Sequence, residues 1–108
     1  MRILRFIVDG QSIVKDPDCD FTGLYPGTDQ YIKAEFSFSP EWSKCKKVAA
    51  FLSIFGKEYQ PQVLEDGKSC IIPAEALIKR SFKIRVIGKD GSVRLTTNKL
   101  LITQDGGK

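Results

Sequence analysis

The chain has 108 residues, of which 42% are apolar and 28% are charged, and its formal net charge at neutral pH is +4. This length allows one domain that buries roughly two-thirds of its unfolded surface, and the ordinary apolar content excludes disorder as the default. Residues 2–8 are too short and too charged for the apolar core of a signal peptide, and no stretch approaches the ~20 apolar residues of a membrane span. We therefore expect a single domain over residues 1–108, made in a cytoplasm.

The N-terminal part of the chain predicts a strand followed by a long loop. Residues 3–8 form the predicted strand, Asp9-Gly10 supplies a turn, and residues 12–14 extend or restart the strand. Two prolines and two glycines then fall between residues 16 and 27. We therefore interpret residues 13–29 as loop-rich.

Three alternating aspartates in this loop resemble the start of a calcium-binding loop. They are Asp16, Asp18 and Asp20. The EF-hand pattern then requires a glycine and a closing glutamate, but the chain has Phe21 and Gly27 at those positions. We therefore expect no metal site here.

Residues 31–55 form the centre of the predicted fold, as a strand, a tight corner and a second strand. Apolar and polar residues alternate over 31–38, which gives this strand one apolar face and one polar face. The corner contains a proline and the single tryptophan, and residues 48–55 form a second apolar run. We expect the core to be built on Phe36, Phe38, Trp42 and Phe51, with the indole buried at the corner.

Short elements follow this unit. Residues 58–64 predict an edge strand, because Pro61 cannot donate a hydrogen bond within a sheet. Residues 65–68 predict a hairpin turn into a short strand over 69–72. Residues 73–77 predict one helical turn that begins with a proline.

The C-terminal part of the chain predicts a hairpin over residues 82–104. Asp90-Gly91 suits a two-residue turn, and pairing about it places Val86 opposite Leu95 and Ile84 opposite Thr97 on the inner face. Residues 99–103 continue as the last strand, and residues 105–108 form a polar tail.

The outer face of this hairpin provides the predicted binding site. By the two-residue period of a strand, it carries a row of Lys83, Arg85 and Arg94. Like charges that lie opposite one another repel, so the row does not stabilise the fold. We interpret it as a surface for an acidic partner, and a solvated face is the alternative.

Seven or eight short strands at this spacing, with one helical turn, predict an all-β, immunoglobulin-like sandwich of two sheets. A small SH3-like or OB-type barrel is the alternative fold.

The composition argues against catalysis and cofactor binding. The chain has no histidine, so the commonest general base and the serine–histidine and cysteine–histidine pairs are excluded. The cysteines Cys19, Cys45 and Cys70 are spaced unlike a zinc site, and without an export signal we expect reduced thiols. Cys45 and Cys70 fit small buried apolar groups. We therefore expect no catalytic residue, no metal and no cofactor.

The charge is distributed unevenly along the chain. Residues 9–41 contain seven acids and two lysines, whereas residues 79–99 contain seven basic residues and one acid. Opposite poles can orient the domain on a partner or favour head-to-tail self-association. The sequence argues against nucleic acid as a partner, because the aromatic residues available for stacking, Tyr25, Tyr31 and Tyr59, lie in acidic or neutral stretches.

Several short motifs together resemble a small β domain of tailed-bacteriophage virion proteins. They are residues 8–12 (VDGQS), Tyr31 leading into 36–38 (FSF), 41–42 (EW), 50–51 (AF), 72–77 (IPAEAL), 86–88 (VIG) and 94–98 (RLTTN). The resemblance covers residues 3–103. It implies an immunoglobulin-like sandwich that serves as a capsid decoration, as a head-fibre base or as the attachment domain of a baseplate protein.

The resemblance also implies a function without catalysis. Baseplate and fibre versions continue into long downstream segments, whereas this sequence ends at Lys108. We therefore expect an auxiliary protein on the outside of a capsid, with the major capsid protein or another virion protein as partner. The alternatives are an attachment domain in a head fibre or receptor-binding assembly, and a small soluble module that binds nucleic acid or a host protein.

Overall fold

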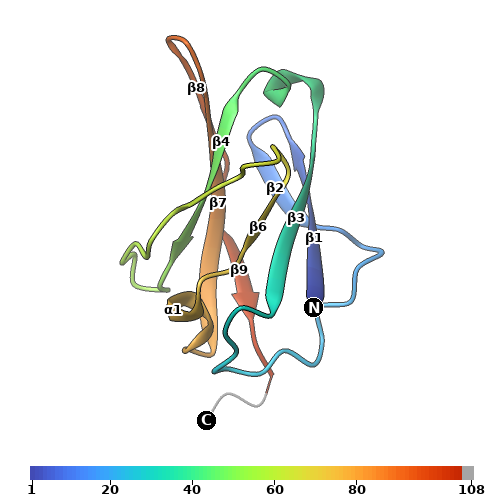
Figure 1. The fold of residues 1–108 in the computed structure, drawn as a ribbon, viewed down its shortest axis with the longest axis vertical. Coiled ribbons are helices and arrows are strands. Elements are labelled where there is room, and N and C mark those ends of the chain that lie inside the picture. Colours follow the sequence, from blue (N-terminus) through green and yellow to red (C-terminus); the bar gives the residue numbers. More distant parts are fainter. Residues whose placement is uncertain (106–108) are drawn as a thin grey trace.

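The computed structural model describes residues 1–105 and shows two β-sheets packed face to face (Figure 1). The four-stranded sheet has the order β2-β1-β3-β6 and consists of β1 (Arg2–Asp9), β2 (Ser12–Lys15), β3 (Ile32–Phe38) and β6 (Ser69–Ile71). The five-stranded sheet consists of β4 (Lys46–Leu52), β5 (Gln62–Val63), β7 (Ser81–Asp90), β8 (Val93–Thr96) and β9 (Leu100–Thr103). The predicted all-β sandwich is confirmed.

Two short helical segments connect the sheets. The 3₁₀ turn η1 (Pro40–Trp42) leads from β3 into β4, and α1 (Ala74–Leu77) lies between β6 and β7. The predicted helical turn is therefore present, with Pro73 directly before it. The predicted polar tail, apart from Asp105, lies outside the described residues.

Part of the strand order matches that of an immunoglobulin-like sandwich, although the parallel pairing of β1 with β3 departs from it. Strands β3 and β6 pair within one sheet, while β4, β7 and β9 are neighbours in the other, as the B–E and C–F–G strands are in that fold. Within residues 1–105 no ladder joins the two sheets, which argues against the barrel alternative.

The pairing of β1 with β3 is parallel, whereas every other pairing between the described strands is antiparallel. Parallel neighbours need a long connection that brings the chain back to the same end of the sheet. Here β2 and residues 16–31 form this connection. The backbone N–H of Arg2 donates to the carbonyl of Tyr31, which fixes the end of the connection beside the start of β1.

The core lies between the sheets and contains a continuous series of aromatic rings. Phe6 stacks on Phe36 with ring centroids 5.4 Å apart, Phe36 lies 5.9 Å from Phe38, and Phe38 lies 5.3 Å from Trp42. The structure buries Phe36, Trp42 and Phe51, and it packs a partly exposed Phe38 against them. The four residues that the sequence assigned to the core therefore all contact it.

Trp42 fixes the corner between the sheets. Its side chain is fully buried, and its Nε1–H donates to the carbonyl of Gly10 at 2.8 Å. The backbone N–H of Ser39 donates to Val8 at the end of β1. The β1–β2 turn and the η1 corner are therefore joined by hydrogen bonds as well as by packing.

The second apolar run is shorter than predicted. Strand β4 ends at Leu52, and residues 53–56 form a turn in place of the expected strand to Phe55. The cause is local, because the Ser53 hydroxyl accepts hydrogen bonds from Phe55 and Lys57 while Gly56 has a φ of 91°.

The predicted hairpin at residues 65–68 is also wrong in its pairing. The turn is present, but β5 and β6 belong to different sheets. The Asp66 carboxylate accepts the backbone N–H groups of Lys68 and Ser69, and the Lys68 carbonyl accepts the N–H of Phe36. These bonds direct the chain toward β3 and away from β5. The segment after Pro61 lies at a sheet edge, as predicted, but of the predicted strand over residues 58–64 only Gln62–Val63 form a strand, β5.

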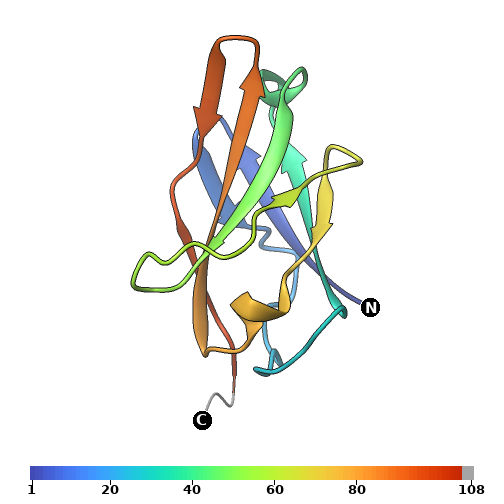
Figure 2. The same cartoon turned by 60° about the vertical axis from the view of Figure 1, so that its left-hand side comes forward.

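The last hairpin has a different register from the one predicted. Its turn centres on Gly91-Ser92, since Asp90 pairs with Val93 and Gly88 pairs with Leu95. Gly91 has a φ of 58° and Ser92 does not have a positive φ, which is the pattern of a type II′ turn with glycine first. The tip of this hairpin extends past the end of the sandwich (Figures 1 and 2).

Candidate binding face

The outer face of the five-stranded sheet carries the predicted site residues. On β7, the side chains of Phe82, Ile84 and Val86 are buried in the core, so the alternate residues point outward. The β4–β7 register places four outward pairs side by side: Leu52 with Lys83, Ala50 with Arg85, Val48 with Ile87, and Lys46 with Lys89.

The structure does not bring the predicted residues Lys83, Arg85 and Arg94 together as one site. All three point to the same face, but Arg94 pairs with Lys89, four residues along β7 from Arg85. The prediction was wrong because it centred the turn one residue too early. That error moves the partner of each β8 residue by two positions along β7. The β8 side chains therefore have different neighbours but still point to the same face of the sheet.

Arg85 is engaged within the chain. Its Nη2 lies 3.3 Å from Glu58 Oε2, and its side chain is only 24% exposed. It lies beside Ala50, which is buried, and its Nε is a buried group without a hydrogen-bond partner in residues 1–105. The guanidinium therefore covers the sheet and binds Glu58.

A different set of three cations forms a row across three strands. Lys46 lies opposite Lys89, and Lys89 lies opposite Arg94, so β4, β7 and β8 each contribute one positive charge. All three residues are exposed. The two ion pairs of the described residues are Arg5–Glu35 and Arg85–Glu58, so neither involves this cation row.

The cation row borders a shallow hollow of about 510 Å³ with an apolar floor of Val48 and Ile87. The row predicted from the sequence included Arg94 but not Lys46 or Lys89. The missing signal was the register, since Lys46 is 43 positions from Lys89 in the sequence. A correct type II′ turn at Gly91 would have placed Lys89 opposite Arg94, but only the β4–β7 pairing adds Lys46.

The three cysteines, Cys19, Cys45 and Cys70, are unpaired. Burial raises the pKa of the Cys70 thiol to about 12. Such a thiol is not ionised at neutral pH and is a poor nucleophile. Residues 1–105 contain no group of three or more His, Cys, Asp or Glu residues placed to hold a metal ion. The distinguishing chemical property of the outer face of the five-stranded sheet is its positive charge.

Comparison of the chain with protein-family models, with curated proteins and with solved structures found no match. Within residues 1–105, no helix has the length and apolar character needed to cross a membrane.

Proposed function

We propose that the chain is a non-enzymatic structural protein of a bacteriophage virion, namely an auxiliary protein that binds the outside of the capsid through the cation row. The observation that carries this proposal is the alignment of Lys46, Lys89 and Arg94 on adjacent strands of a rigid sheet. Directly opposed like charges cost up to ~1 kcal/mol per pair, so the arrangement opposes folding. An acidic partner surface removes this repulsion, and the motifs that resemble phage virion domains supply the setting.

The surroundings of the cation row favour a protein partner over nucleic acid. The hollow beside it is lined by aliphatic, glycine and serine residues together with the cations, and by no aromatic side chain. Single-stranded nucleic acid is usually held by aromatic rings that stack on the bases. An apolar floor beside fixed cations suits a protein surface that combines carboxylates with an apolar contact.

The test uses particles that lack the protein. Purified protein is added back, and its copy number per particle is measured across a range of salt concentrations. We expect the Lys46→Gln/Lys89→Gln/Arg94→Gln variant to show lower occupancy and a weaker salt dependence than the wild type. A matched control removes the same charge from three exposed cations that do not line this hollow, Lys68, Arg80 and Lys99. The control should bind like the wild type.

Several results would overturn the proposal. Absence of the protein from purified virions would exclude the virion assignment. Equal occupancy and equal salt dependence for both triple variants would show that the cation row is a solvated face and does not bind the particle. Binding to tails and not to heads would favour an attachment domain of a baseplate or fibre. Tight binding to DNA or RNA with no binding to particles would favour a nucleic-acid module.

A further inference from the structure

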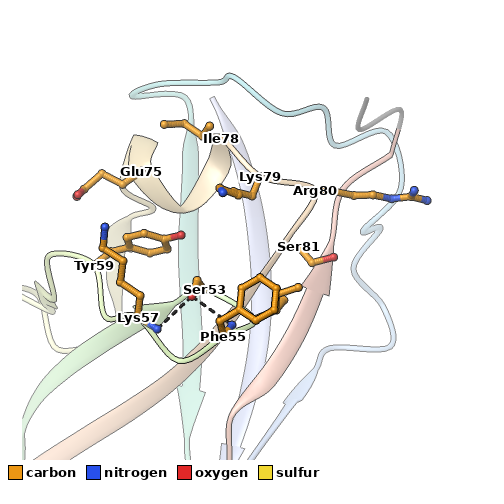
Figure 3. Close-up of a pocket in the computed structure, with 10 residues that line it drawn as sticks. Ser53, Phe55, Lys57, Tyr59, Glu75, Ile78, Lys79, Arg80 and Ser81 are labelled. Carbon is orange, nitrogen blue, oxygen red and sulfur yellow. Dashed lines mark hydrogen bonds between the residues drawn. The ribbon is translucent and has the colours of Figure 1, made fainter.

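A second hollow lies at the other end of the molecule, between the turn after β4 and helix α1 (Figure 3). Its volume is about 790 Å³. The lining includes three exposed apolar side chains: Ile54, which is 46% exposed, Phe55, which is 92% exposed, and Ile78, which is 64% exposed. Phe55 and Ile78 lie on opposite sides of the hollow (Figure 3).

The exposure of Phe55 is built into a rigid turn. The Ser53 hydroxyl accepts the N–H groups of Phe55 at 3.2 Å and of Lys57 at 3.0 Å. The backbone of Ser53 also donates to the Lys57 carbonyl and accepts from Gly56. These hydrogen bonds fix the turn and so keep the Phe55 side chain exposed to solvent. An exposed aromatic side chain on a rigid turn is a typical interface anchor.

The charge around this hollow is mainly positive. Lys57 and Lys79 border it, and Glu75 is the one acid among the lining residues. Arg80 also belongs to the lining but extends away from the hollow (Figure 3). A symmetric contact between two copies of the hollow would bring two mainly positive surfaces together. The charges therefore favour an acidic occupant with an apolar or aromatic side chain.

The chain itself carries such a segment in residues 16–29. This loop contains four aspartates and no lysine or arginine, and its Tyr25 is 61% exposed. It is preformed, because the Arg2 guanidinium donates to the carbonyls of Asp20 and Thr22. In Figure 1 the first part of the loop lies on the side of the molecule opposite the turn after β4, whereas its later part passes beside α1, where the N–H of Gly27 donates to the carbonyl of Leu77.

We propose that the hollow binds the loop of residues 16–29 from a second copy of the chain, with Tyr25 between Phe55 and Ile78 and the aspartates beside Lys57 and Lys79. The contact joins two unlike surfaces: repeated head to tail it builds rings or open chains of copies, and made twice about a two-fold axis it closes a dimer. It uses neither the cation row nor a capsid, and it goes beyond the proposed function.

The experiment is sedimentation of the purified protein over a range of concentrations, at low (~0.05 M) and high (~0.5 M) salt. We expect the mean mass of the wild type to rise with concentration at low salt and less at high salt. The Phe55→Ser variant should weaken association by at least about tenfold, since it removes a large apolar contact. The Asp18→Lys/Asp29→Lys variant should do the same, and both aspartates are exposed.

Mixing the two variants provides the decisive control. The loop of the Phe55→Ser protein is intact, and so is the hollow of the Asp18→Lys/Asp29→Lys protein. Each variant alone should associate at least about tenfold more weakly than the wild type, while the mixture should form a 1:1 dimer that cannot extend. Recovery of binding in the mixture also shows that both variants are folded.

Three outcomes would overturn this proposal. A wild type that stays monomeric at every concentration would exclude a second copy of the chain as the occupant of the hollow. Association of the Phe55→Ser variant equal to that of the wild type would exclude the hollow. A wild-type dimer that does not extend, together with no recovery in the mixture, would indicate a symmetric contact.

Discussion

Gly88 on β7 lies so close to Trp42 that a Cβ atom placed on it would stand 2.6 Å from the indole Cζ3. The indole thus occupies the space that any other residue would need at position 88. Its Nε1–H is held by the Gly10 carbonyl, so the ring cannot move away without breaking that hydrogen bond. The corner between β3 and β4, the β1–β2 turn and the central strand β7 therefore depend on one another.

Replacing Gly88 with alanine should destabilise the domain by about 1–3 kcal/mol, because the methyl group forces the indole or β7 to shift. Urea unfolding measures this change in the free energy of unfolding. The Ser92→Ala variant, at an exposed position of the same hairpin, should change stability little. In a Trp42→Phe background the cost of Gly88→Ala should shrink. An equal cost in both backgrounds would show that the indole is not the obstacle.

Replacing Trp42 with alanine should cost about 3–5 kcal/mol, because it removes the largest fully buried side chain and leaves a cavity. That loss threatens a domain whose total stability is ~5–15 kcal/mol. Since Trp42 is the only tryptophan, its fluorescence reports the site directly. We expect blue-shifted emission with little quenching by iodide in the folded protein. An emission maximum typical of an indole in water would contradict the buried position.

Removing the charges of the cation row should change the stability of the domain in the opposite direction from most multiple substitutions. The Lys46→Gln/Lys89→Gln/Arg94→Gln variant should be as stable as the wild type or more stable, by up to about 1 kcal/mol at low salt. The difference should vanish at high salt, where the repulsion is screened. Thermal unfolding at two salt concentrations tests this. A clear loss of stability would mean that these side chains stabilise the fold.

Asp66 should contribute to the acid sensitivity of the fold. The Ser69 hydroxyl and the backbone N–H groups of Lys68 and Ser69 donate to its carboxylate, and they lower its pKa from 3.8 to about 2. The unfolded state therefore takes up this proton first as the pH falls. The contribution is present above pH 3.8 and is lost as the pH falls toward about 2.

The measurement is the free energy of unfolding of the wild type and of Asp66→Asn between neutral pH and pH 2. The variant should be less stable at neutral pH and should lose less stability through the acid window. Glu41, whose pKa is lowered by the Ser39 hydroxyl, titrates in both proteins and cancels in the comparison. Parallel pH profiles would show that the Asp66 carboxylate does not couple to folding.

The amino-acid pattern predicted the parts of this fold that depend on residues close together in the sequence. The strand at residues 31–38, the turn at Gly10 and the one-turn helix after Pro73 were all placed close to where the structure has them. Errors occurred where a side chain bonds to the backbone. Ser53 ends β4 three residues before Phe55, and Asp66 turns the chain into the other sheet. Such bonds compete with strand pairing but leave apolar periodicity unchanged.

By itself the sequence determined which side chains share a face, because the direction of a side chain alternates along a strand whatever the strand pairs with. It therefore identified an outward, basic side of the last hairpin and a buried Trp42. Only the tertiary structure decided which outward cations are neighbours, since register is set by the turn at Gly91 and by the pairing of β7 with the distant β4. It also decided which apolar residues stay uncovered. Phe55 belongs to an apolar run by sequence, yet it stands in water because the chain turns at Ser53 and no described element packs over it.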